Sequence, residues 1–312
     1  MKIIRLDQET MVYKPCVATI GFFDGVHRGH QFLIKHLVET ARAEGRESTI
    51  ITFEEHPRKV LQSDYQPHML STLDEKLQLL SKTEVDNVVL LHFDREMAEM
   101  SAHDFMKNIL HDKLCVQKLF IGYDHRFGHN RSEGFEDYVR YGREMGMEVV
   151  KNQAFVLNGI NVSSSEVRSF VEAGEVELAK RCLGYPYTII GKVVKGFQEG
   201  RKMGFPTANL DISEFGQMTP EPGVYAVRVR MEKTDGMKEG MMNIGTRPTF
   251  GGEKITLEVN IFDFTGDLYG QLLMVSFEHR IRGERKFSSP EALARQLTTD
   301  QEIIKQKFKE EL

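Results

Sequence analysis

The sequence has no tryptophan, only three cysteines and no apolar run as long as a membrane span requires. Cys16, Cys115 and Cys182 are odd in number and far apart, which argues against a disulfide framework and indicates a reducing compartment. No run approaches the roughly 20 apolar residues that cross a bilayer. The first ten residues include four charged side chains and lack the apolar core of a signal peptide. We therefore expect a soluble, cytoplasmic protein with no membrane partner.

The sequence also lacks a basic excess. Lys and Arg total 41 against 46 Asp and Glu, which gives a net charge of −5. A dedicated nucleic-acid binder usually carries net positive charge, so we expect no nucleic-acid partner. The 312 residues are 40% apolar and 28% charged, an ordinary globular balance long enough for two domains.

Strand-like and helix-like segments alternate in the first half of the chain. Short runs rich in Val, Ile, Leu and Phe lie at 16–23, 48–53, 87–93 and 118–124. Helical spacing follows the first run and stops near Gly45, and another helix is expected from Ser101, which has the side chain of an N-cap. Such alternation predicts a doubly wound, Rossmann-like α/β domain, whose ligands bind beyond the carboxyl ends of its strands.

From about Tyr187 the pattern becomes all-β. Strand-like runs at 188–196, 223–231, 255–264 and 272–281 are separated by turn residues, which predicts an antiparallel barrel or sandwich. One helix is expected at the end of the chain, with Ser289 as N-cap and Pro290 in its first turn. We predict two domains, at residues 1–184 and 185–312.

The stretch TIGFFDGVHRGHQ, residues 19–31, lies where the first strand turns into a helix. Unpaired N–H groups and the helix dipole make such a turn suitable for a phosphate. His27 and His30 are three residues apart, so both rings project from one face and could donate to a reacting phosphate. A capped turn with exposed histidines is the alternative. A metal site would need a third ligand, and no such residue lies nearby in the sequence.

Two further segments of the first half carry side chains suited to ligand binding. In VSSSEVRSFVEAG, residues 162–174, Ser163 and Glu166 have the spacing of a capping box, and hydroxyls and a guanidinium gather at the same helix start. The alternative for this set is a purely structural cap. The stretch IGYDHRFGHNRSEG, residues 121–134, follows a strand without turning into a helix and is interpreted as a functional loop.

The second half offers a glycine-rich basic segment followed by small polar residues. GKVVKGFQEGRKMGFPTANL contains Gly191, Lys195 and Gly196, which suit a loop around nucleotide phosphates, although a solvated hairpin is the alternative. Thr207 and Asn209 follow Pro206, and Mg²⁺ often takes only one or two protein oxygens beside phosphates and water. Thr207 is therefore a candidate Mg²⁺ ligand, with a structural role as the alternative.

A glutamate lies in the middle of an expected strand. In ITLEVNIF, residues 255–262, alternation places the apolar side chains on one face and Thr256, Glu258 and Asn260 on the other. Glu258 could serve as general base for a hydroxyl nucleophile. An exposed glutamate on a solvated sheet face is the alternative.

Four segments of the first half, in order, resemble the adenylyltransferase module of prokaryotic bifunctional FAD synthetases: GFFDGVHRGHQ, TFEEHP, GYDHRFGHNRSEG and VSSSEVRSFVEAGEVELAKRCLGYPY. The H-x-G-H element alone is shared with class I aminoacyl-tRNA synthetases and other nucleotidyltransferases. The resemblance implies that His27 and His30 bind ATP phosphates and stabilise the transition state, with Asp124 near the phosphates or the flavin. The remaining residues that it implies at ATP are Gly21, Phe22, Asp24, Gly25, Ser163, Ser164, Ser165 and Arg168. His125, and Glu55 before His56, depart from the family pattern.

Five segments of the second half resemble a riboflavin kinase module: GRKMGFPTANL, GVYAVRV, NIGTRPTF, LEVNIFDFTGDLYG and FEHRIRGERKFSSPEALARQL. The resemblance implies a six-stranded barrel in which Thr207 and Asn209 hold Mg²⁺ and ATP, and Glu258 is the base. It also implies a loop, containing Arg282 and Glu284, that closes on the flavin. The ATP site would include Gly191, Lys195 and Gly196. Asn260 stands where the family commonly has histidine.

Together these resemblances imply a bifunctional riboflavin kinase/FMN adenylyltransferase. Its partners would be riboflavin, FMN, FAD and ATP, with Mg²⁺ accompanying ATP, and the chain would be a monomer or weak homo-oligomer. The alternatives are a nucleotidyltransferase of another substrate whose barrel only binds flavin, and a non-catalytic flavin- or RNA-binding regulator.

Overall fold

The computed structural model describes residues 1–6, 14–62, 68–123, 125–196, 200, 204–232, 236–249 and 252–311. The chain forms two compact units, one of residues 1–67 and 72–164 and the other of residues 68–71 and 165–312. Residues 165–184 thus pack with the second unit, and the predicted boundary between 184 and 185 remains a prediction.

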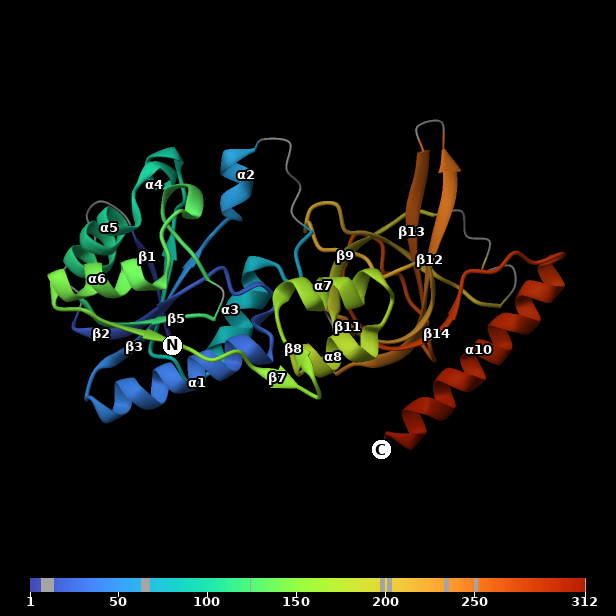
Figure 1. Ribbon diagram of the computed structural model, residues 1–312. Helices are drawn as coiled ribbons and strands as arrows, with labels where there is room; N and C mark the ends of the chain where they lie inside the picture. The colour runs from blue at the N-terminus through green and yellow to red at the C-terminus, as the bar shows by residue number, and fades with distance from the viewer. Residues whose placement is uncertain are drawn as a thin grey trace. The chain divides into compact units, whose positions relative to one another are not determined.

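The first unit contains a parallel sheet of six strands in the order β1-β4-β3-β2-β5-β6 (Figure 1). The strands are β1 (Lys2–Leu6), β2 (Cys16–Ile20), β3 (Glu47–Phe53), β4 (Asn87–Leu91), β5 (Val116–Ile121) and β6 (Glu148–Lys151). The four predicted strands are confirmed as β2 to β5. Chain order reverses between β2 and β5, and in such sheets ligands bind outside the carboxyl ends of the strands at this switch point.

Helices cover both faces of this sheet. Successive strand residues point to opposite faces, so Val17 packs with helices α1 (Arg28–Ala43) and α3 (Leu73–Ser81), whereas Ala18 packs with α5 (Ala102–Phe105) and α6 (Phe135–Met145). The predicted helix at Ser101 is present, with the Ser101 hydroxyl accepting from the Asp104 N–H at 3.0 Å. It continues as the π-helix η2 (Met106–Lys113).

Short elements complete the first unit. The 3-10 turn η1 (Asp24–Val26) precedes α1, and the remaining short elements are α2 (Pro57–Leu61), α4 (Arg95–Glu99), η3 (His129–Arg131), β7 (Val156–Leu157) and β8 (Ile160–Asn161).

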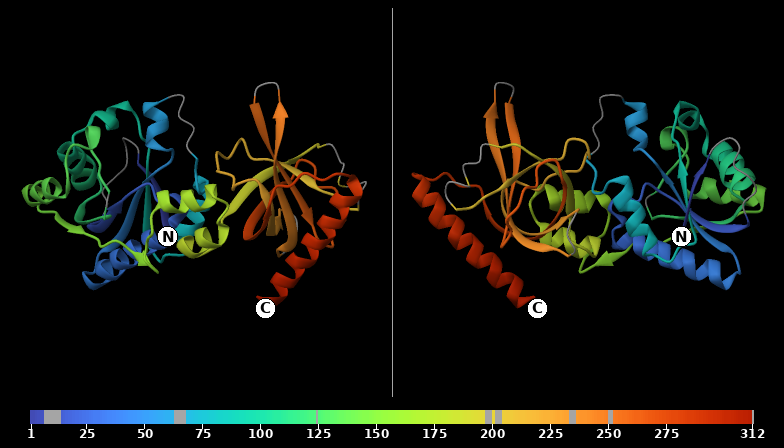
Figure 2. Two further views of the ribbon diagram at one scale, coloured as in Figure 1. Left: turned by 45° about the vertical axis from the view of Figure 1, so that its right-hand side comes forward. Right: turned by 180° about the vertical axis from the view of Figure 1, so that it is seen from behind.

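The second unit contains a closed antiparallel barrel in the order β10-β13-β12-β11-β14-β9. Its strands are β9 (Thr188–Val194), β10 (Ala208–Asp211), β11 (Gly223–Met231), β12 (Lys238–Thr249), β13 (Gly252–Ile261) and β14 (Leu272–Gly283). The barrel is confirmed, and closure leaves its sheet with no open edge. The final helix α10 (Pro290–Glu310) begins as predicted, because the Ser289 hydroxyl accepts from the Ala292 N–H at 3.2 Å. Figure 2 shows α10 running along the outside of the barrel.

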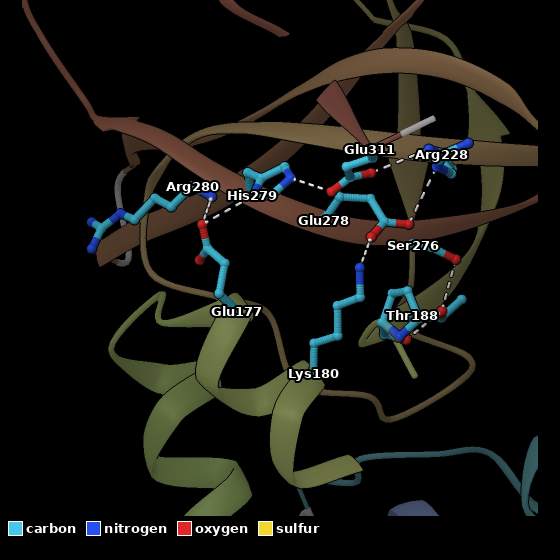
Figure 3. Close-up of polar contacts among 10 residues, drawn as sticks. Glu177, Lys180, Thr188, Arg228, Ser276, Glu278, His279, Arg280 and Glu311 are labelled. Atoms are coloured by element: carbon cyan, nitrogen blue, oxygen red, sulfur yellow. Dashed lines mark hydrogen bonds and ion pairs between the residues drawn. The ribbon is translucent and has the colours of Figure 1, made fainter. Parts of the chain in front are cut away.

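Helices α7 (Ser164–Glu172) and α8 (Val176–Leu183) come before the barrel strands, and α8 packs against β14. Lys180 Nζ lies 2.6 Å from the buried carboxylate of Glu278 in β14, and Arg228 Nε lies 3.5 Å from the same carboxylate (Figure 3). His279 lies between Glu177 of α8 and Glu311 after α10, at 3.4 and 2.7 Å. Polar contacts therefore join α8, β14 and the end of α10.

Within the ranges described, no helix has the length and apolarity of a membrane span.

Candidate functional sites

The opening turn lies at the carboxyl end of β2, beside the switch point of the first sheet. The rings of His27 and His30 stack with centroids 3.6 Å apart and an interplanar angle of 20°. The expectation that both imidazoles share one face of the first helical turn is confirmed. Gly29 permits this arrangement, because a Cβ there would lie 2.9 Å from the Val162 carbonyl and 3.1 Å from the His27 ring.

His27 caps α1 with its own ring. The Nδ1 atom of His27 accepts from the His30 N–H at 3.3 Å, so a neutral ring carries its proton on Nε2. The side chain is only 4% exposed, which restricts the ring to one orientation. This tautomer presents an N–H donor of the kind that a phosphate oxygen accepts.

The backbone of this turn is strained. Phe23 has φ 55° and Val26 has φ 35°, a left-handed conformation that is a clear outlier for a β-branched residue. Gly25 has φ 71°, and it adopts this conformation without strain because it has no Cβ. Residues held in this way cost of order 1–3 kcal/mol each and gather at functional sites, where surrounding contacts fix them.

Ser164, at the start of α7, contacts the opening turn. Its hydroxyl donates to the Asp24 carbonyl at 3.2 Å, so the serine cluster and the glycine turn meet within the first unit. Helix α7 begins one residue after Ser163, as predicted. Ser165 and Arg168 belong to the second unit, where Arg168 Nε donates to the His68 carbonyl at 3.1 Å. The roles of Ser165 and Arg168 toward ATP remain predictions.

The loop after β5 lies at the other side of the switch point. An apolar cavity of about 70 Å³ lies at the carboxyl ends of the strands, and Ile20, Phe53 and Phe127 are among its lining side chains. Phe127 stacks on Tyr138 with ring centroids 4.3 Å apart, which fixes the loop against α6. Asp124 lies outside the described residues, so its predicted role stays a prediction.

The chain departs from the first family pattern at His125 and at Glu55, and both His125 and His56, which follows Glu55, have local structural contacts. His56 caps α2, because its Nδ1 accepts from the Arg58 N–H at 3.1 Å, and its ring lies 4.8 Å from that of Phe22. His125 ends a tight turn in which its N–H donates to the Gly122 carbonyl at 3.2 Å.

The barrel brings the predicted kinase residues together on strands β10 and β13 and on the residue directly before β10. Asn209 of β10 is opposite Glu258 of β13, and the Thr207 hydroxyl donates to Glu258 Oε2 at 3.2 Å. Asn260, which sequence reasoning left without a role, is 5% exposed and donates to the Pro206 carbonyl at 2.7 Å. It thereby fixes the backbone just before Thr207.

A cavity of about 370 Å³ adjoins this group. Its walls include Thr207, Val259 and the loop after β13, with Phe264, Asp267 and Tyr269 among the lining residues. That volume is at the lower end of the range for small-molecule sites. The motif LEVNIFDFTGDLYG contained this loop, but only the fold shows that it returns over Thr207.

The glycine-rich segment differs in part from its prediction. Gly191 lies inside strand β9, so the expectation of a loop at this residue is wrong. A Cβ at Gly191 would lie 3.0 Å from the Leu210 Cβ, so the close approach of β9 and β10 favours glycine there. Lys195 and Gly196 do follow the strand, and a Cβ on Gly196 would overlap the Asn209 side chain. Residues 201–203 are outside the described part of the chain.

The expectation that Arg282 lies in a closing loop is also wrong. Arg282 is in strand β14, and its Nε donates to both oxygens of the buried Asp300 in α10, at 3.2 and 3.0 Å. Gln296 also donates to Asp300, at 2.9 Å. Glu284 follows the strand directly and accepts from the Thr246 hydroxyl at 3.2 Å. Contact of Arg282 and Glu284 with flavin remains a prediction.

Comparison with known proteins agrees with both halves of this description. The FAD synthetase family matches residues 9–166, and the riboflavin kinase family matches residues 183–308. A bifunctional riboflavin kinase/FMN adenylyltransferase of Haemophilus influenzae is 38% identical over 309 residues, which cover 99% of each chain. The chain belongs to this bifunctional family. The member from Escherichia coli is 38% identical, covering 94% of this chain and 93% of its own, and that from Pseudomonas fluorescens is 39% identical, covering 92% and 91%.

A solved structure also spans the full length of this riboflavin kinase/FMN adenylyltransferase family member. A Streptococcus pneumoniae crystal structure, described as a macrolide-efflux protein, is 30% identical and covers 98% of this chain and 99% of its own, with a TM-score of 0.86. The two-unit architecture is therefore shared over nearly the whole of both chains.

Proposed function

We propose that this chain makes FAD from riboflavin in two ATP-dependent steps, one in each compact unit. The observation that carries the proposal is that each family matches a different half of the chain, and each half brings its own motif residues into contact. The barrel phosphorylates riboflavin to FMN, and the α/β unit adenylylates FMN to FAD.

In the kinase step, the ribityl 5′-hydroxyl gives its proton to Glu258 as its oxygen attacks the γ-phosphorus of ATP, and ADP leaves. The hydrogen bond from Thr207 orients the Glu258 carboxylate. The cavity beside Thr207 supports placement of the nucleotide there.

Hard oxygen donors around Thr207 fit Mg²⁺, because Thr207, Asn209 and Glu258 supply hydroxyl, amide and carboxylate oxygens on adjacent strands. Thr207 and Asn209 would hold it. When bound with ATP, Mg²⁺ neutralises phosphate charge that builds up during transfer.

In the adenylyl transfer step, a phosphate oxygen of FMN attacks the α-phosphorus of ATP, and the bond to the bridging oxygen of pyrophosphate breaks. The FMN phosphate is largely ionised near pH 7, so the attack needs no general base. The stacked His27 and His30 rings donate to the charge that develops on the phosphates.

Product analysis tests the proposal. The protein is incubated with riboflavin and MgATP, and FMN and FAD are resolved by chromatography over time. We expect FMN to appear first and FAD to follow at its expense. FAD formed only from added FMN, with none from riboflavin, would instead support a nucleotidyltransferase whose barrel merely binds flavin.

The cellular compartment is also part of the proposal. The three cysteines are free thiols, which fits a reducing compartment such as the cytoplasm.

We propose that the protein is a monomer or a weak homo-oligomer. Light scattering after size-exclusion chromatography would test this oligomeric state.

A further inference from the structure

We propose that Lys76 is a positioning residue for adenylyl transfer, holding the strained turn that carries Asp24 and leads to His27. This inference rests on the assignment of adenylyl transfer to the opening turn. Lys76 was not singled out by the sequence, and it belongs to α3 rather than to any quoted motif.

Burial of Lys76 requires an explanation. Lys76 is only 3% exposed, although a lysine is almost never fully buried without partners. Helix α3 begins with a capping box between Thr72 and Glu75, and Lys76 is the next residue along the helix. A buried ammonium is costly unless every hydrogen finds an acceptor.

The acceptors of Lys76 match its three hydrogens in number. Its Nζ lies 3.2 Å from the Phe22 carbonyl, 3.0 Å from the Phe53 carbonyl and 3.3 Å from the Thr52 hydroxyl oxygen. The same ammonium lies 4.4 Å from the centroid of the Phe22 ring. The Thr52 hydroxyl in turn donates to the Phe22 carbonyl at 3.1 Å. Lys76 thus ties the end of β2 to the end of β3.

The tie is made directly before the strained turn. Phe22 directly precedes Phe23, whose left-handed backbone begins the turn, and the Val26 carbonyl at its other end accepts from the Gln31 side chain at 2.8 Å. Strained backbone persists only where its surroundings over-determine it. Lys76 and Gln31 hold the two ends, and the segment between them ends one residue before His27.

Among the described residues, few charged groups lie around Lys76. Asp24 of η1 acts on it across the turn, and Glu75 on its own helix is engaged with Thr72. His56 lies beyond the Phe22 ring. Burial lowers the pKa of Lys76 to about 8, against the opposing influence of Asp24. Above that pH the amine loses one of its three donors, and the Phe22–Phe53 tie weakens.

The test is Lys76→Met in the full chain, with Lys82→Met, an exposed lysine at the end of the same helix, as matched control. We expect kcat for FAD formation from FMN to fall roughly ten- to a hundredfold, because small displacements of reacting groups have effects of that size. Riboflavin phosphorylation, measured on the same sample, stays within about twofold. Thr52→Val, which removes one acceptor, gives a smaller loss in the same direction.

The pH profile separates positioning from a merely structural role. Wild-type FAD formation should decline as pH rises through about 8, and Lys76→Met should lack that decline. Wild-type kcat with an unchanged profile in Lys76→Met would overturn the inference. His27→Ala combined with His30→Ala is run in parallel. If that pair also left FAD formation intact, the assignment of the site itself would fail, and the inference with it.

Discussion

The Thr207 hydroxyl hydrogen-bonds the Glu258 carboxylate at 3.2 Å, although the two residues are 51 positions apart in the chain. Strands β10 and β13 are neighbours in the closed barrel, so the contact is built by barrel closure and not by local sequence. Asn209 is opposite Glu258 in this strand pair, and Thr207 also lines the adjoining cavity of about 370 Å³.

Glu258→Gln should abolish FMN formation from riboflavin, since the amide cannot accept the hydroxyl proton. Loss of general-base catalysis alone is worth about a hundred- to ten-thousandfold. FAD formation from supplied FMN should be unchanged. Glu232→Gln, at an exposed position after β11, is the control. A kinase rate within a few-fold of wild type in Glu258→Gln would show that another group is the base.

His27→Ala with His30→Ala should remove FAD formation and spare FMN formation. In the proposed mechanism the two stacked rings donate to the reacting phosphates, and loss of one such donor costs about a hundred- to a thousandfold. The paired assay is conversion of riboflavin to FMN and of FMN to FAD on one sample. His111→Ala, on the distant η2, should leave both steps as they are.

Asp300→Asn should weaken both the barrel and its kinase step. Asp300 is 1% exposed and accepts two hydrogen bonds from Arg282, so its loss leaves a mostly buried guanidinium without a counter-charge, at about 3 kcal/mol. We expect a lower urea midpoint and a raised KM for riboflavin, with FAD formation from FMN intact. An unchanged KM would mean that Arg282 stabilises the barrel but has no part in flavin binding.

Lys76→Met should change how stability depends on pH. The pKa of Lys76 falls from 10.5 to about 8 on folding, so the folded chain binds fewer protons than the unfolded chain between these values. The cost of burying the charge is complete below pH 8 and disappears as pH rises to about 10.5. The stability of Lys76→Met relative to wild type should therefore decline by about 3 kcal/mol over that window. Urea unfolding at pH 7.5 and 10.5 measures it, and equal differences at both pH values would contradict the lowered pKa.

The alternation of apolar runs was sufficient to predict an α/β sheet, through four of its six strands, and the change to an all-β second half. Each of these strands carries its own local signal, because buried parallel strands are continuous apolar runs. Strand β12 escaped such reasoning, since NIGTRPT is rich in turn residues and is held as a strand by pairing with β11 and β13. Local propensity was overridden by neighbours far away in sequence.

The candidate sites also contain both features that the local sequence could predict and features that depend on the fold. The three-residue spacing of His27, the N-cap of α1, and His30 in its first turn was sufficient to predict that both rings lie on one face, although not that they stack. Burial of Lys76 depends on where α3 meets the ends of β2 and β3, and in LDEKLQLL this lysine resembles any solvated one. The partner of Arg282 lies 18 positions on, in a different element, and only the fold reveals it.

Helix α8 limits where the chain can be cut into separately expressed domains. The FAD synthetase match ends at residue 166 and the riboflavin kinase match begins at 183, so α8 falls almost wholly between them. Yet Lys180 of that helix neutralises Glu278, which is 4% exposed in the barrel wall. A barrel expressed from residue 185 onward would retain a buried carboxylate deprived of its lysine. A kinase domain expressed on its own therefore needs the twenty residues that precede residue 185.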